Sequence, residues 1–97
     1  MAKRIIWSKR AQSDRKQILQ FWIEHNKSKT YSIKLNHLFR GGASLLAVHP
    51  TIGIQTDYET VRSKLVRDYR IFYEIKGESI HVLTIWDCQR DLTNIKL

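Results

Sequence analysis

The stretch YRIFYEIKGESIHVLTIW, residues 69–86, holds two runs of β-branched and aromatic residues joined by a short polar segment that contains a glycine. Runs of this composition favour extended strands, and a glycine between them is typical of a tight turn. If residues 77–78 form a two-residue turn, Tyr73 lies opposite Val82 in an antiparallel pair. The stretch therefore predicts a β-hairpin.

Alternation along the hairpin assigns its side chains to two faces, because successive residues of a strand point to opposite sides. The buried face is expected to hold Tyr69, Ile71, Tyr73, Ile75, Ile80, Val82, Thr84 and Trp86. The other side, which we call the open face, is expected to hold Arg70, Phe72, Glu74, His81, Leu83 and Ile85. An exposed apolar floor ringed by charge is typical of a binding surface, so the open face is the candidate site.

The run TVRSKLV, which precedes the hairpin, allows two registers. A two-residue turn would bury Arg62 and Lys64, which is costly unless both side chains find partners. A three-residue connection at 66–68 would instead place Lys64 opposite Arg70. We expect this second register, which gathers Arg62, Lys64 and Arg70 on the open face, with Arg90 just past the last strand.

The N-terminal half of the chain carries two helical patterns. After the strand-like run KRIIW, Ser8 is suited to cap a helix over residues 9–25, whose apolar residues recur at helical spacing. A second pattern starts near Thr30 and ends at His49-Pro50, because proline disfavours helical geometry in the residue before it. Residues 51–57 are expected to form a loop.

The order of the predicted elements is strand, helix, helix and three strands. Helices gathered on one side of antiparallel strands are typical of an α+β domain. We therefore expect two helices packed on one face of a small antiparallel sheet. At 97 residues the chain has the size of a single domain, residues 1–97.

The composition favours binding to a polyanion. Seventeen Lys and Arg against nine Asp and Glu give a formal net charge of +8, which favours polyanions such as RNA, DNA, an anionic membrane surface or an acidic protein. The single cysteine, Cys88, excludes an internal disulfide and fits a reducing compartment. No run approaches the roughly 18 apolar residues that a membrane span needs. These features indicate a cytoplasmic protein without a membrane segment.

Four segments, IIWSKRA, LLAVHPTIG, VRSKLVRDYRIFYEI and HVLTIWDCQRD, together resemble the RelE/ParE superfamily of toxins from bacterial type II toxin–antitoxin systems, which serve in plasmid stabilisation. The resemblance covers nearly the whole chain. It implies two helices on one side of a small sheet and a concave basic face on the other. It also implies that a cognate acidic antitoxin covers this face in a heteromeric complex.

The resemblance implies two alternative targets, because RelE-like members cut mRNA on the ribosome whereas ParE-like members inhibit DNA gyrase. By position, Arg70 and Arg90 match arginines of the RelE-like catalytic site, and Arg62 and Lys64 resemble its paired lysines. The catalytic tyrosine of RelE-like enzymes is absent from the C-terminal stretch DLTNIKL. The residues expected to contact nucleic acid or antitoxin are Arg62, Lys64, Arg70, Phe72, Leu83 and Arg90.

Without that tyrosine a ribonuclease would need another general acid or base. His81 is the candidate, since it is expected opposite Glu74 on the open face, although a functionless surface ion pair is the alternative. The missing tyrosine slightly favours the ParE-like alternative, which needs no catalytic residue. A plain RNA-binding module is a third alternative. No cofactor is expected, and no metal site, because the histidines show no ligand spacing.

Overall fold

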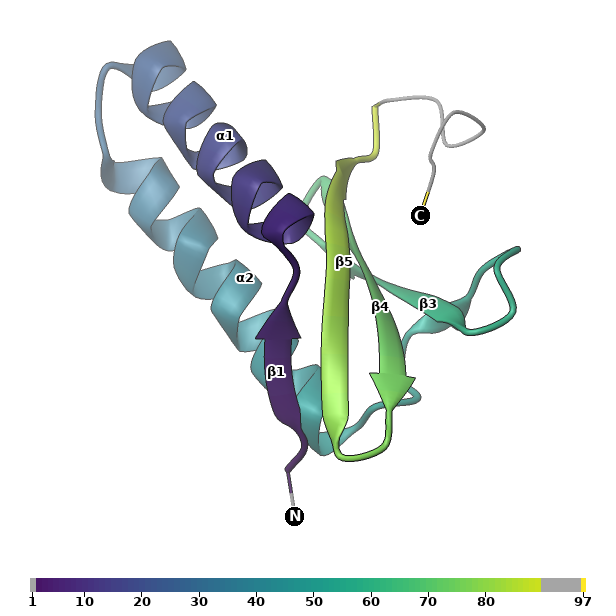
Figure 1. Cartoon of the computed structure of the whole chain (residues 1–97). Helices are drawn as coiled ribbons and strands as arrows, with labels where there is room; N and C mark the ends of the chain where they lie inside the picture. The colour runs from purple at the N-terminus through teal and green to yellow at the C-terminus, as the bar shows by residue number, and fades with distance from the viewer. Residues whose placement is uncertain (1, 90–96) are drawn as a thin grey trace.

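The computed structural model of the chain describes residues 2–89 and 97, which form two helices and a five-stranded sheet (Figure 1). In chain order the elements are β1 (Arg4–Trp7), α1 (Lys9–Asn26), α2 (Thr30–Val48), β2 (Ile54–Gln55), β3 (Val61–Val66), β4 (Tyr69–Lys76) and β5 (Ser79–Asp87). The strands lie in the order β1-β5-β4-β3-β2, and both helices pack on one face. The predicted α+β class is confirmed.

Two features of the sheet differ from the prediction. β1 pairs with β5 in parallel, whereas the other neighbouring strands are antiparallel. The short strand β2 lies within residues 51–57, for which a loop is predicted. That prediction is wrong at Ile54 and Gln55, because their backbone pairs with Ser63 and Arg62 at the sheet edge.

Helix α1 begins where the sequence predicts, because the Ser8 hydroxyl caps it. The Ala11 N–H donates to Ser8 Oγ at 3.0 Å, and the same hydroxyl donates to the Leu83 carbonyl oxygen of β5 at 2.9 Å. Ser8 thus satisfies a backbone donor of the first turn and ties that turn to the sheet. Helix α2 ends at Val48, directly before His49-Pro50.

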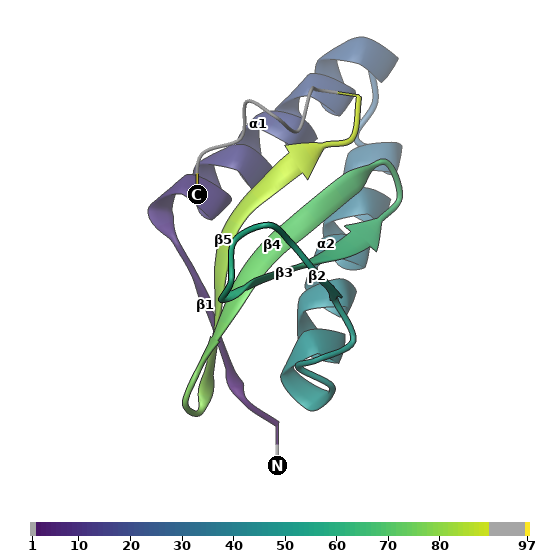
Figure 2. The same ribbon diagram turned by 90° about the vertical axis from the view of Figure 1, so that its right-hand side faces the viewer.

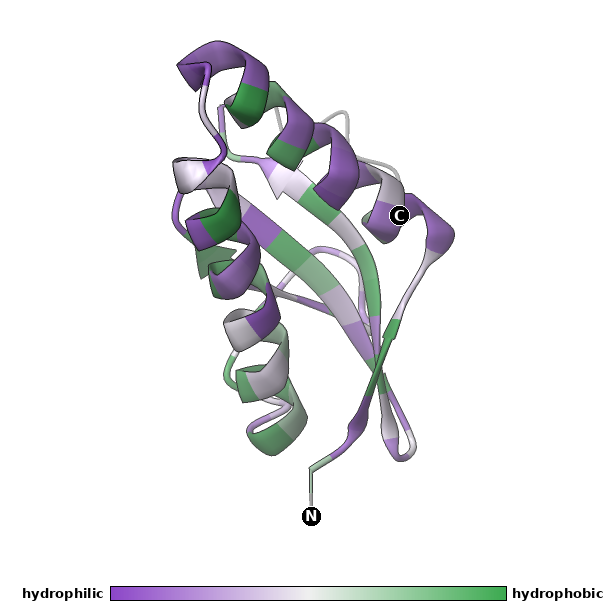
Figure 3. Ribbon diagram, turned by 90° about the vertical axis from the view of Figure 1, so that its left-hand side faces the viewer, coloured by the Kyte–Doolittle hydropathy of each residue, from purple (hydrophilic) through white to green (hydrophobic). Residues whose placement is uncertain are grey.

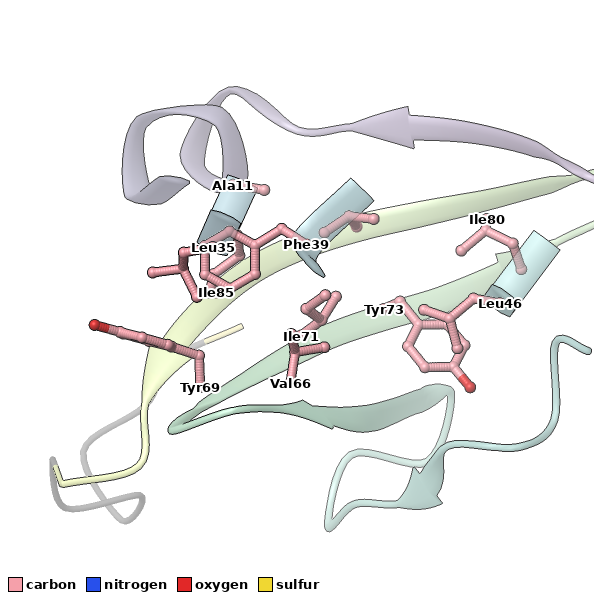
Figure 4. Packing of buried hydrophobic residues seen from close by; sticks show 11 residues of the cluster. Ala11, Leu35, Phe39, Leu46, Val66, Tyr69, Ile71, Tyr73, Ile80 and Ile85 are labelled. Atoms are coloured by element: carbon pink, nitrogen blue, oxygen red, sulfur yellow. The ribbon is translucent and has the colours of Figure 1, made fainter. Parts of the chain in front are cut away.

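The main core lies between the helices and the sheet (Figure 4). Leu35, Phe39 and Leu46 of α2 are fully buried, and so are Ile71 and Tyr73 of β4. Burial of apolar area of this kind is the dominant favourable term in folding. The C-terminal end of α2 is rich in hydrophobic residues, which Figure 3 shows in green.

The β4–β5 hairpin begins in the predicted register. Residues 77–78 form the turn, and its glycine has a φ of +56°, a conformation that side chains disfavour. Glu74 pairs with His81, and Tyr73 pairs with Val82. This part of the prediction is confirmed.

A β-bulge then shifts the register by one residue, so that Phe72 pairs with Thr84 rather than with Leu83. Beyond the bulge, Ile85 and Trp86 of β5 lie on the opposite faces of the sheet from those predicted. Ile85 belongs to the main core, and Trp86 packs on the open face instead. The predictions for Ile85 and Trp86 are therefore wrong, because the extra residue of a bulge reverses the alternation after it.

The register of β3 is also different from the expected one. Residues 67–68 form a two-residue turn, so Lys64 pairs with Ile71 and Arg62 pairs with Tyr73. Arg62 and Lys64 consequently lie on the helix side, and the prediction that they share the open face with Arg70 is wrong. Both stay half-buried at the margin of the sheet, so the full cost of burying a charge does not arise.

The loop before β2 is fixed by two side chains of the sheet. Arg62 Nη1 donates to the carbonyl oxygens of Gly53 at 2.9 Å and Thr51 at 3.3 Å. The Tyr73 hydroxyl donates to the Pro50 carbonyl oxygen at 2.6 Å and accepts from the Gly53 N–H at 3.0 Å. A Cβ atom on Gly53 would lie 2.4 Å from this hydroxyl, so glycine is required there.

Replacing Tyr73 with phenylalanine is expected to lower the free energy of unfolding by about 1–2 kcal/mol, because the Gly53 N–H and the Pro50 carbonyl lose their partner.

The stability of the wild type should also depend on pH, because burial raises the pKa of Tyr73 above its ordinary value of 10.0. Above that pH the unfolded chain loses the Tyr73 proton while the folded chain keeps it, so stability of the wild type falls. Urea titrations at neutral and alkaline pH check both effects, and an unchanged midpoint at neutral pH would contradict the first.

Candidate functional site

The open face of the sheet lies on the side away from the helices, which Figure 2 turns toward the viewer. The observed registers and alternation place on it Val61, Ser63, Leu65, Arg70, Phe72, Glu74, His81, Leu83 and Trp86. Of the six hairpin side chains predicted for this face, five are therefore there and Ile85 is not.

Arg70 lies half-buried on the open face, and a neutral group holds it. Its Nη1 donates to the hydroxyl of the buried Ser63 on β3 at 3.3 Å. Burial raises the pKa of the Cys88 thiol just after β5, and the Arg70 charge opposes that rise. Among the residues that the structure describes, no salt bridge pairs with Arg70. Arg90, the second predicted arginine, lies outside the described residues.

The apolar part of the open face is a small second core. Val61 and Phe72 are only 4% and 5% exposed, and they pack with Leu83 and Trp86. Side chains covered in this way offer little area to a partner. The prediction of an exposed apolar floor is therefore wrong at Phe72, and the role of Phe72 and Leu83 in binding stays a prediction.

His81 pairs with Glu74 across the strands, as predicted, but the Glu74 carboxylate is engaged elsewhere. The Thr60 hydroxyl donates to one of its oxygens, and Lys76 Nζ lies 3.6 Å from the other. Among the contacts of the described residues, none joins this carboxylate to the imidazole. A catalytic role of His81 stays a prediction, without support from Glu74 as an orienting group.

Much of the positive charge lies on the helix side of the molecule. A groove of about 860 Å³ between the outer faces of the helices is lined by Lys9, Arg15, Lys16 and Arg40, together with polar and aliphatic residues. Arg15 also lies over the Trp7 ring, with its guanidinium carbon 4.5 Å from the ring centroid. The net charge of +8 is thus spread over both sides rather than gathered on the open face.

Asp14 of α1 shapes the open face indirectly, and the sequence pattern does not single it out. Its carboxylate accepts from the Thr84 hydroxyl and, at 3.3 Å, from the Ile85 N–H. These bonds link α1 to the bulged part of β5, where Ile85 faces inward and Trp86 outward. The contact joins residues about 70 positions apart, so no local signal predicts it.

The described residues form neither a metal-ligand cluster nor a membrane-spanning helix. Within 2–89 and 97, no group of three His, Cys, Asp or Glu residues could hold a metal ion. Nor do these residues include a helix that is long and apolar enough to cross a membrane.

A family model describes the ParE toxin of the type II toxin–antitoxin system parDE, and it matches residues 5–92. The chain belongs to the ParE toxin family. It is therefore the toxin component of a type II toxin–antitoxin system, and membership implies a complex with an antitoxin. The resemblance to the RelE/ParE superfamily is confirmed.

The fold agrees with the family of ParE toxins. A solved structure described as the chromosomal ParDE TA system from P. aeruginosa matches with a TM-score of 0.77 at 16% identity, covering 89% of this chain and 96% of that chain. At this identity the likeness shows a shared fold. YafQ from E. coli strain BL21(DE3) matches with a TM-score of 0.49 at 15% identity, covering 88% of this chain and 92% of that chain. No curated protein matches the chain.

Proposed function

We propose that this ParE-family toxin acts in the cytoplasm, where it binds DNA gyrase and inhibits it through protein contact, without catalysis and without a cofactor. The family match over residues 5–92 carries the proposal. An acidic antitoxin binds the basic toxin and keeps it inactive until the antitoxin is lost. Residues 1–97 act as one toxin domain.

The described part of the open face does not gather the basic residues that a RelE-like ribonuclease site would need. Cleavage of RNA requires activation of the 2′-hydroxyl, stabilisation of the phosphorane charge and protonation of the leaving oxygen. Arg70 can supply the second of these. Arg62 and Lys64, which resemble the paired lysines of RelE-like enzymes, lie on the helix side. These placements support the ParE-like alternative.

The proposal is tested with purified gyrase and a relaxed plasmid. We expect supercoiling to fall with increasing toxin and to recover when the product of the adjacent reading frame is added in equal amount. Unimpaired supercoiling, together with codon-positioned cuts in mRNA on purified translating ribosomes, would replace this proposal with the RelE-like alternative.

The variant Arg70→Ala separates folding from function. Within the described part of the chain, the Arg70 side chain donates one hydrogen bond, to the neutral hydroxyl of Ser63, so we expect the free energy of unfolding to change by less than about 1 kcal/mol. In a protein contact Arg70 is one group among several, and gyrase inhibition should weaken by about tenfold at most. A variant that fails to fold in circular dichroism would contradict the placement of Arg70 on the open face.

A further inference from the structure

The two helices carry most of the positive charge of the chain. Residues 9–48, which span α1 and α2, contain eight Lys and Arg against two acids, so they hold +6 of the formal net charge of +8. Both acids are engaged, because Asp14 is bonded to β5 and the Glu24 carboxylate accepts from Gln20 Nε2 at 3.1 Å. Figure 3 turns the helices toward the viewer and shows α1 largely in purple, the colour of hydrophilic residues.

The groove between the outer faces of the helices gathers part of this charge. Its charged lining residues are Lys9, Arg15, Lys16 and Arg40, and no Asp or Glu lines it. Among the residues that the structure describes, no salt bridge joins any of these four cations to a carboxylate. Four like charges around one groove repel each other, and a bound anion relieves that repulsion.

The start of α1 adds to the positive potential of the groove. The first turn of this helix carries Lys9 and Arg10 and no acidic residue. The N-terminus of a helix bears a partial positive charge, so cations are unfavourable there and anions are favourable. A local conflict of this kind is typical of a functional surface.

Arg15 is held in place before any ligand binds. Its half-buried side chain lies over the Trp7 ring, with the guanidinium carbon 4.5 Å from the ring centroid. A guanidinium that stacks on a ring keeps its N–H groups at the edge of its plane, where they suit phosphate oxygens. Because this side chain is already ordered, less entropy is lost when a phosphate binds.

The lining of the groove favours a polyanion over a protein. Its aliphatic residues, Leu19 and Ile23, are half-buried, and Leu19 packs on the main core, so the groove offers a protein little apolar area. No aromatic residue lines the groove, so it has no surface on which the bases of a single strand could stack. The ligand that fits is a regular row of phosphates.

The spacing of the cations matches such a row. Lys9 and Lys16 lie about two turns apart on α1, which corresponds to about 10 Å. Phosphates of one strand of duplex DNA follow each other at about 3.4 Å along the helix axis, so this length meets about three of them. Arg40 of α2 lines the same groove from its other side.

We propose that the groove between the outer faces of α1 and α2 binds the phosphate backbone of duplex DNA. The contacts are made to phosphates and not to base edges, so binding is insensitive to sequence and falls steeply with salt. This inference goes beyond inhibition of gyrase by protein contact. The choice of DNA over RNA as the duplex rests on the proposed function, because gyrase acts on DNA.

The test measures binding of the purified full-length toxin to fluorescently labelled DNA duplexes of two unrelated sequences, by anisotropy at several salt concentrations. The double variant Lys16→Gln/Arg40→Gln should bind both duplexes at least tenfold more weakly at low salt. Its slope of log affinity against log salt should be smaller by about two, since two phosphate contacts are lost. Both side chains are exposed, so the circular dichroism spectrum should not change.

The matched control is Lys29→Gln/Lys34→Gln, which removes the same charge at exposed positions that do not line the groove. It should weaken binding less than threefold. Equal losses in the two double variants would show that net charge alone attracts DNA, and would overturn the inference.

Two further outcomes would also overturn it: absence of DNA binding by the wild type at low salt, and tighter binding of an RNA duplex of the same sequence. Gyrase inhibition is measured separately. A wild-type toxin that binds duplex DNA through the groove but leaves supercoiling unimpaired would count against the proposed function and not against the DNA site.

Discussion

Replacing Phe39 with alanine is expected to lower the free energy of unfolding by about 3–5 kcal/mol. Phe39 lies in the middle of α2, is fully buried, and packs edge-on against the Tyr69 ring with the ring centroids 5.6 Å apart. The truncation removes buried apolar area and leaves a cavity that the surrounding helix and strand cannot close. Since a small domain has only about 5–15 kcal/mol of stability, the variant should be close to unfolding. Urea denaturation followed by circular dichroism measures the loss.

The matched control for Phe39 is Phe21→Ala on α1. Phe21 is 53% exposed, and its ring contacts are with Trp22 and His25 of the same helix. Because most of its area already faces water, the expected loss is about 1 kcal/mol at most. Equal losses in the two variants would contradict the burial of α2 against the sheet.

The helices and the hairpin could be predicted because their signals are local. The hydroxyl of Ser8 caps the helix that follows it, Pro50 ends the helix before it, and Gly77 allows the turn between two apolar runs. Each of these effects acts within a few residues. The structure accordingly keeps all three boundaries close to their predicted positions.

The residues of the open face could be predicted only in part, because tertiary contacts decide two of them. The bulge in β5 exchanges the positions of Ile85 and Trp86, and strict alternation contains no sign of it. The desolvation argument for β3 assumes that helices cover Arg62 fully. At the sheet margin, however, the Gly53 carbonyl oxygen accepts from its guanidinium, which offsets the cost.

The family could be predicted whereas the target stays a proposal, because the two depend on very different numbers of residues. Family membership rests on residues spread over most of the chain. The target depends on a small number of side chains. Of those predicted, Arg62 and Lys64 lie on the helix side, and Arg90 lies outside the described residues. The gyrase and ribosome assays therefore decide the target more directly than further comparison of sequences.

Replacing Asp14 with alanine is expected to lower the free energy of unfolding by about 2–4 kcal/mol, because two donors of β5 lose a charged acceptor together. One donor is the hydroxyl of Thr84, which is almost completely buried, and the other is the Ile85 N–H. Thermal and urea unfolding of the variant measure the loss.

Two further variants show whether Asp14 acts through these bonds. Asp14→Asn keeps one acceptor oxygen and should lose about half as much stability as Asp14→Ala, since a neutral acceptor bonds more weakly than a charged one. Thr84→Val removes one donor, so in a double-mutant cycle the alanine variant should cost less in the Thr84→Val background. Strict additivity would show that Asp14 stabilises the protein by another route. A coupling energy between the two substitutions would instead show that Asp14 stabilises the protein through its bond to Thr84, and thus that α1 stabilises the bulged part of β5.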